Sequence, residues 1–193
     1  AIHIDNTKQI YKNDKTASYQ KLLQDTMGIP KLKELMERCP EDTEVYTTSA
    51  CIALAFEDYK LAKRLYGRAI ETDLWNATLH VYRGVVHEKL NLPKEALYDY
   101  RHAIRLDSLN AMNYFYQGNA LLTLKEYRKA INSYTKSIDL CPVQLDAYEN
   151  RATSYRALED FEMALADYNF IINRYPESAP TYYNRGVLFL IMN

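Results

Sequence analysis

Alanine recurs every 34 residues through most of this chain, and a tyrosine follows each of these alanines by four positions. The alanines are Ala62, Ala96, Ala130 and Ala164, and the tyrosines are Tyr66, Tyr100, Tyr134 and Tyr168. A fixed period of this length is typical of a repeat protein, in which each unit is one supersecondary element that buries its apolar face against its neighbours. The period therefore constrains the fold more strongly than local propensity does.

Two further columns keep the same phase, one rich in aromatic rings and one made of small residues. The aromatic-rich column is Tyr46, His80, Tyr114, Tyr148 and Tyr182, and the small column is Ala50, Gly84, Gly118, Ala152 and Gly186. Small residues let two backbones approach closely, and large rings fill the space beside them. These columns predict the core, and they explain most of the 18 tyrosines.

Within residues 111–144 the spacing predicts two helices. Tyr114, Gly118 and Leu121 recur at intervals of four and three, which places them on one helical stripe. A second stripe consists of Ala130, Tyr134, Ser137 and Ile138. Between them, Lys125 and Glu126 form a turn that is long enough only for an antiparallel hairpin, and Cys141-Pro142 ends the second helix. The fold class predicted is all-α.

The pattern of these residues resembles the tetratricopeptide repeat family. The residues that carry the resemblance most clearly are Tyr114, Gly118, Leu121, Tyr127, Ala130, Tyr134, Ser137 and Pro142. The resemblance implies a right-handed α-solenoid of antiparallel helix pairs, with units at 43–76, 77–110, 111–144 and 145–178 and a half unit at 179–193. Residues 1–42 are expected to form a divergent N-terminal helical cap, because Leu32 and Pro40 fall in phase with the tyrosine and proline columns.

The chain departs from the family pattern at two columns. A leucine that the family often carries before the small column is replaced by Ser49, Arg83, Gln117, Arg151 and Arg185. Leu74 and Ser108 stand where the terminal proline is usual. We expect neither departure to change the fold.

Composition disfavours several classes of function. The chain has 24 basic and 25 acidic residues, so it lacks the positive charge of a nucleic-acid binder. Its cysteines, Cys39, Cys51 and Cys141, have neither disulfide nor zinc spacing, which favours a reducing, cytoplasmic location. We found no apolar run long enough to cross a membrane and no signal-peptide pattern.

The sequence offers little material for catalysis. His80 and His87 lie seven apart in core columns, so packing or orienting roles are expected rather than metal binding. None of the five glycines makes a phosphate-binding loop. We therefore expect no enzymatic activity, no cofactor and no metal. Trp75, in an inter-unit turn, is expected to pack between neighbouring units.

The family resemblance implies that the first helix of each unit lines an inner groove. The candidate groove residues are Tyr82, Val85, Met112, Phe115, Tyr116, Asn119, Glu149, Asn150, Thr153, Tyr183 and Asn184. Aromatic rings beside amides suit peptide recognition, because a ring contributes apolar area and an asparagine can bond both a backbone donor and a backbone acceptor. Phe115 and Tyr116 lie outside the core columns, so we expect them to serve binding and not stability.

Some members of the family are co-chaperones that hold the C-terminal carboxylates of large heat-shock chaperones with lysine, asparagine, asparagine, lysine and arginine. The aligned residues here are Phe115, Asn119, Asn150, Pro180 and Asn184. Both asparagines match and every cation is absent, so charge-assisted bonds worth about 1.5–3 kcal/mol each would be missing. Carboxylate-clamp binding of chaperone tails is therefore disfavoured.

The sequence predicts a non-enzymatic scaffold that binds a segment of a partner protein within a larger assembly. The alternative is a targeting or regulatory module of a larger enzyme whose catalytic domain lies outside this chain. Residues 187–192 form a nearly all-apolar helix end. Either the natural sequence continues there or another chain covers this face, so self-association through residues 187–192 is a further expectation.

Overall fold

The structure, a computed structural model, describes residue 34 and residues 36–192. Most of these residues are helical, and the described part contains no strand. The helices are α4 (Thr43–Ala55), α5 (Tyr59–Thr72), α6 (Ala77–Lys89), α7 (Pro93–Leu106), α8 (Ala111–Thr123), α9 (Tyr127–Leu140), α10 (Leu145–Ala157), α11 (Phe161–Arg174) and α12 (Ala179–Met192). This architecture confirms the predicted all-α solenoid of antiparallel helix pairs.

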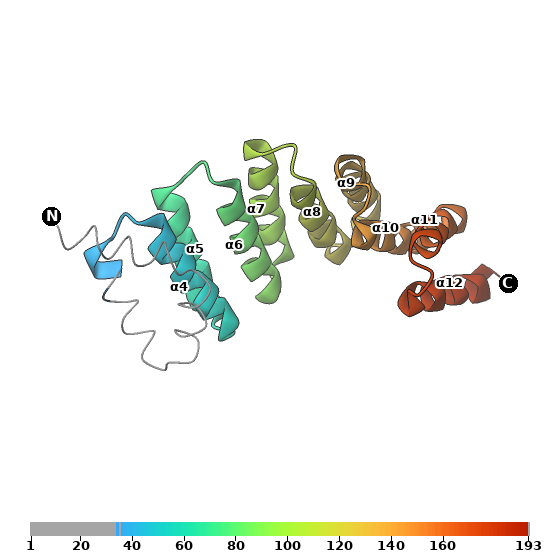
Figure 1. The fold of residues 1–193 in the computed structure, drawn as a ribbon, viewed down its shortest axis with the longest axis horizontal. Coiled ribbons are helices and arrows are strands. Elements are labelled where there is room, and N and C mark those ends of the chain that lie inside the picture. The colour runs from blue at the N-terminus through green and yellow to red at the C-terminus, as the bar shows by residue number, and fades with distance from the viewer. Residues whose placement is uncertain (1–33, 35, 193) are drawn as a thin grey trace. The chain divides into compact units, whose positions relative to one another are not determined.

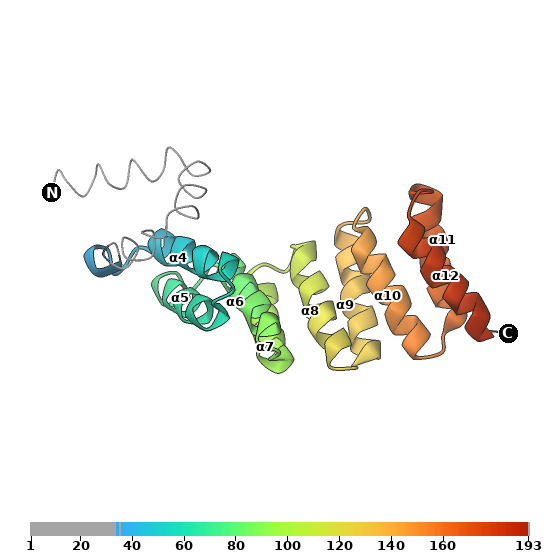
Figure 2. The same ribbon diagram turned by 90° about the horizontal axis from the view of Figure 1, so that it is seen from below.

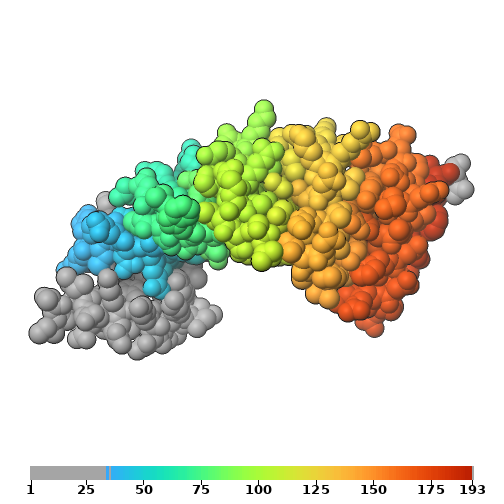
Figure 3. Space-filling model, turned by 90° about the horizontal axis from the view of Figure 1, so that it is seen from above, coloured from blue at the N-terminus to red at the C-terminus, as the bar shows by residue number. Residues whose placement is uncertain are grey.

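The chain divides into two compact bodies between Asp73 and Leu74. In the first body, α4 packs against α5. In the second body, each helix from α6 to α12 packs against the next one in the chain, and Figures 1 and 2 show these helices following one another in chain order. In the space-filling view of Figure 3, the successive helices of the second body form one surface without a gap between them. The predicted N-terminal cap falls mostly on residues 1–33, which lie outside the described residues.

The turns inside the four complete helix pairs share one backbone conformation. Glu57, Asn91, Lys125 and Glu159 all have positive φ angles, between 58° and 62°. At the end of α8, Lys125 N donates to Leu122 O at 2.9 Å and Glu126 N donates to Leu121 O at 2.9 Å. This pair of bonds is a Schellman motif, which satisfies the last carbonyls of the helix and reverses the chain in a few residues. The turn predicted at Lys125 and Glu126 is confirmed.

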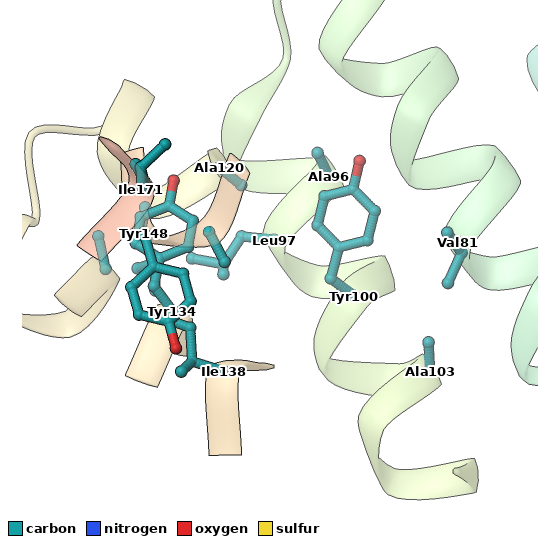
Figure 4. Close-up of a cluster of buried hydrophobic side chains, with 13 residues drawn as sticks. Val81, Ala96, Leu97, Tyr100, Ala103, Ala120, Tyr134, Ile138, Tyr148 and Ile171 are labelled. Carbon is teal, nitrogen blue, oxygen red and sulfur yellow. The ribbon is translucent and has the colours of Figure 1, made fainter. Parts of the chain in front are cut away.

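The core consists of the columns that repeat every 34 residues. Tyr100, Tyr134 and Tyr168 are buried in the second body, as are Ala96, Ala130 and Ala164 (Figure 4 shows Tyr100, Tyr134 and Ala96). Gly84 and Gly118 lie directly under the rings of Tyr100 and Tyr134, respectively. The predicted complementarity of small and large residues is therefore confirmed.

Two of the three arginines of the leucine column, Arg83 and Arg151, pair with aspartates on the second helix of their own unit. Arg83 donates to Asp99 through Nε at 3.0 Å and through Nη2 at 2.6 Å. Arg151 contacts Asp167 in the same bidentate way, at 2.9 and 2.7 Å. Between them, Ser133 donates to Gln117 at 2.9 Å. A polar pair thus replaces the usual apolar contact without opening the core.

Two expectations about aromatic residues are wrong. Trp75, in the turn between α5 and α6, is 83% exposed. Tyr182 belongs to the aromatic column, yet it is 43% exposed. Its counterparts Tyr46 and Tyr148 are buried at 6% and 7%. Within the described residues, α12 lacks the following helix that covers the first helix in the earlier pairs.

Candidate interaction surface

The predicted groove residues of α8 and α10 meet through a chain of amide hydrogen bonds. Tyr134 donates its hydroxyl proton to Asn119 Oδ1 at 2.9 Å, and Asn150 Nδ2 donates to the same oxygen at 3.0 Å. Asn119 is therefore saturated as an acceptor, and its Nδ2 group makes no hydrogen bond within the described residues. Asn150 keeps an unused carbonyl oxygen in the same way. One donor and one acceptor stand side by side on adjacent first helices.

A second amide bond continues this surface from α10 to α12. Asn184 Nδ2 donates to Glu149 Oε1 at 2.8 Å. Both side chains are half-buried. We call the surface formed by Phe115, Tyr116, Asn119, Glu149, Asn150 and Asn184, with the adjoining side of α6, the first-helix face.

The aromatic residues of this face, Phe115 and Tyr116, pack against the core more closely than we expected from their positions outside the core columns. The Tyr116 ring stacks on the buried Tyr100 ring at 5.5 Å between centroids, and Phe115 packs edge-on against Tyr116 at 5.6 Å. The Phe115 centroid also lies 6.1 Å from that of Tyr134. Both residues are half-buried and pack against the main apolar cluster. This packing argues against the expectation that their replacement would barely change stability.

The other predicted residues are distributed around this centre. Tyr82 is 41% exposed on α6, whereas Val85 is half-buried there. Met112, 40% exposed, accepts a weak hydrogen bond from Gln144 at 3.2 Å at the start of α8. Thr153 bonds its own helix at Glu149 O, and Tyr183 is 73% exposed on α12. These predicted residues therefore lie on the first helices α6, α8, α10 and α12.

Glu88 is a feature of this region that the prediction of groove residues left out. It belongs to α6, where one carboxylate oxygen, Oε1, is buried and has no hydrogen-bond partner in the described part of the chain. Burial raises the pKa of Glu88, and the neighbouring Tyr100 hydroxyl and Lys89 oppose this shift only in part. Burial also raises the pKa of the Tyr100 and Tyr134 hydroxyls, with the Glu88 charge adding to both shifts. The sequence places Glu88 on the first helix of its unit, outside the core columns.

The structure also contains a pocket of about 550 Å³ that the sequence did not predict. It lies where the C-terminal ends of α8 and α10 approach the starts of α9 and α11. Its lining includes Thr153, which belongs to the predicted groove set, together with Lys125, Arg156, Glu159 and Ile191. These residues come from two helices, α10 and α12, and two turns, so no local pattern in the sequence brings them together.

Two histidines, His80 and His87, lie beside the carboxylate of the Arg83–Asp99 ion pair. His87 Nδ1 lies 3.0 Å from Asp99 Oδ2, and His80 Nδ1 lies 3.7 Å from Asp99 Oδ1. His102 stacks on His80 at 4.7 Å between ring centroids. Among the described residues, no group of three histidine, cysteine, aspartate or glutamate side chains could hold a metal ion. The orienting role expected for His80 and His87 agrees with this geometry.

The carboxylate-clamp positions present no cation on the first-helix face. Phe115 packs on Tyr116, and Asn184 donates to the carboxylate of Glu149. An incoming carboxylate would meet this negative charge instead of the lysine or arginine that the clamp uses. In the part of the chain that the structure covers, no helix combines the length and the apolarity needed to cross a bilayer.

Comparison with solved structures shows a shared fold at low sequence identity. A crystal structure of YrrB, described as a TPR protein with an unusual peptide-binding site, superposes with a TM-score of 0.78 at 21% identity, over 93% of this chain and 97% of that one. A crystal structure of MamA gives 0.72 at 23% identity, over 76% and 80%. The first TPR domain of Spaghetti (RPAP3), bound to an HSP90 peptide, gives 0.59 at 20% identity, over 61% and 93%.

Comparison with curated proteins returns no match. The sequence itself matches the tetratricopeptide repeat pattern at residues 47–111 and again at residues 113–144, which together make up about half of the chain. These segments contain the alanine, tyrosine and glycine columns whose packing is described above. Arrays of such units present extended binding surfaces, so the chain carries a protein–protein interaction module. The chain belongs to the tetratricopeptide repeat family.

Proposed function

We propose that the first-helix face binds an extended segment of a partner protein and that the chain acts as a scaffold without a reaction of its own. The observation that carries this proposal is the Asn119–Asn150 pair. Because Asn119 retains a donor and Asn150 retains an acceptor, the pair is complementary to the N–H and C=O groups of a peptide backbone.

The neighbouring aromatic residues supply apolar contact area for the same segment. Phe115 and Tyr116 are fixed by ring contacts with Tyr134 and Tyr100, yet both keep part of their surface open. A rigid ring loses little conformational entropy on binding, which is why aromatic residues dominate interface energetics. YrrB is described as having a peptide-binding site and the RPAP3 domain as bound to an HSP90 peptide, and both offer a precedent for this use of the fold.

The absence of a cation at the clamp positions indicates which part of a partner chain could bind. A chain terminus would bring a carboxylate beside Glu149, so we propose an internal stretch of the partner chain as the ligand. Main-chain bonding from the amide pair does not require a charged terminus.

Selection from a random displayed-peptide library provides a test that requires no known partner. Peptides selected on the native protein are expected to bind the Asn150→Ala variant about fivefold or more weakly, since about 1 kcal/mol of hydrogen bonding is lost. Asn132→Ala is the matched control, because Asn132 is an exposed asparagine on the second helix α9. An equal loss of peptide affinity in both variants, or no loss of affinity in either, would reject the first-helix face as the binding surface.

A further inference from the structure

Glu88 differs from the other buried carboxylates of the second body. Asp99 and Asp167 each receive two hydrogen bonds from an arginine. Glu88 has no such partner, and the nearest cation in sequence, Lys89, is exposed at the adjacent position of α6. Adjacent helical residues do not face each other, so Lys89 cannot cover the Glu88 carboxylate as Arg83 covers Asp99.

An unpaired carboxylate in a half-buried setting is costly to a folded protein. Two consequences are visible in this molecule: Glu88 Oε1 lacks a hydrogen-bond partner in the described structure, and burial raises the pKa of the group. The Tyr100 hydroxyl beside it also lacks an aligned partner. A charge that the fold compensates only in part is often retained for binding.

The surroundings of Glu88 suit a cation. The Tyr100 ring next to Glu88 stacks on Tyr116, and Phe115 packs edge-on against Tyr116. Aromatic rings next to a carboxylate attract a cation through both charge and the ring quadrupole. A guanidinium suits this arrangement better than an ammonium, because it can donate to a carboxylate while its plane lies on a ring.

We infer that Glu88 receives a basic side chain of the bound segment, with arginine preferred over lysine. The inference rests on the proposed binding of a segment to the first-helix face and specifies the chemistry of that segment. The ligand is an internal peptide stretch with one arginine that reaches α6 while its backbone meets Asn119 and Asn150. Glu149, the other carboxylate on this face, already accepts from Asn184 and is less available.

The test uses peptides selected from a displayed library on the native protein and synthesised with arginine or with citrulline at the conserved basic position. Citrulline keeps the shape of arginine and removes its charge. The change is expected to weaken binding to the native protein at least tenfold and binding to the Glu88→Gln variant less than threefold. Glu95→Gln, which removes an exposed carboxylate from α7, should keep the tenfold difference.

A separate measurement without peptide tests the premise about Glu88. Removing an uncompensated carboxylate should raise the Tm of Glu88→Gln above that of the native protein, and an unchanged or lower Tm would contradict the premise. If the selected peptides respond to Asn150→Ala but carry no basic residue, or if citrulline acts equally on the native protein and on Glu88→Gln, the inference about Glu88 fails while the proposed function stands. If the peptides do not respond to Asn150→Ala, both fail.

Discussion

Gly118 lies so close to Tyr134 that a β-carbon at position 118 would come within 2.5 Å of Tyr134 Cε1. The same distance separates a β-carbon at Gly84 from Tyr100 Cε1. Each pair joins a first helix to the second helix of the same unit and lets the two backbones approach. The repeat therefore depends on the absence of a side chain in one helix as much as on the ring in the other.

Gly118→Ala is expected to lower the free energy of unfolding by about 1–3 kcal/mol, because the Tyr134 ring is fully buried and cannot move aside. Gly186→Ala is the control, since a β-carbon there meets nothing within 4 Å. It should raise stability by about 0.5–1 kcal/mol through helix propensity. Urea unfolding measures both, and a neutral Gly118→Ala would contradict the close packing of this pair.

Lys125→Gly is expected to stabilise the protein by about 0.5–1 kcal/mol. Lys125 has a φ angle of 59°, a conformation that costs a side chain energy and glycine almost none. Lys136→Gly, inside α9, should instead destabilise by about 1 kcal/mol. Thermal unfolding of the two variants would show shifts of opposite sign, and two shifts of the same sign would exclude the proposed strain.

Asp99→Asn is expected to cost about 3 kcal/mol at neutral pH, because it leaves Arg83 without its counter-charge. Burial alone would raise the pKa of Asp99, but His80, His87 and Arg83 together hold that pKa well below its usual range. The carboxylate therefore stabilises the fold above the pKa of the unfolded chain, about 3.9, and this contribution is lost as pH falls toward the folded-state pKa.

The stability difference between the native protein and Asp99→Asn should accordingly shrink below about pH 4. Chemical unfolding at a series of pH values measures it. Glu126→Gln, which breaks the exposed pair with Lys129, is the control and should leave the unfolding midpoint nearly unchanged. A difference that stays constant between pH 7 and pH 3 would mean that the Asp99 charge does not stabilise the fold.

Leu190→Lys is expected to reduce self-association of the chain. Leu190 is 81% exposed on α12, beside Phe189 and Ile191, which are 48% and 52% exposed. Exposed apolar patches of this kind favour contact with another chain. Sedimentation velocity over a range of concentrations would show a smaller weight-average mass for the variant. A native protein that stays monomeric at every concentration would contradict the expectation.

The repeat period predicted the helices and the core because the same residue types recur at the same positions in every pair. Alanine and tyrosine columns need no tertiary information to be recognised, and the small column lies 16 residues before the tyrosines that cover it. The pairing of Arg83 with Asp99 and of Arg151 with Asp167 follows the same interval of 16 residues. A search for opposite charges at that spacing would have predicted both pairs.

The proposed binding surface was harder to predict from the sequence. Its position follows from the helix order, but the bond from Asn150 to Asn119 depends on the distance between adjacent first helices, which no spacing in the sequence specifies. The partial burial of Phe115 and Tyr116 has the same origin, since each packs on a ring from a second helix. Trp75 illustrates the opposite error, because a large apolar residue in a turn need not find a partner.

The side-chain amide signals of asparagine in two-dimensional ¹⁵N NMR test the central claim most directly. On titration with a library-selected peptide, the signals of Asn119 and Asn150 are expected to shift, because these two side chains bond the peptide backbone. The signals of Asn132 and Asn173, exposed on the second helices α9 and α11, should stay in place. Shifts confined to Asn132 and Asn173, with Asn119 and Asn150 unchanged, would contradict the assignment of binding to the first-helix face.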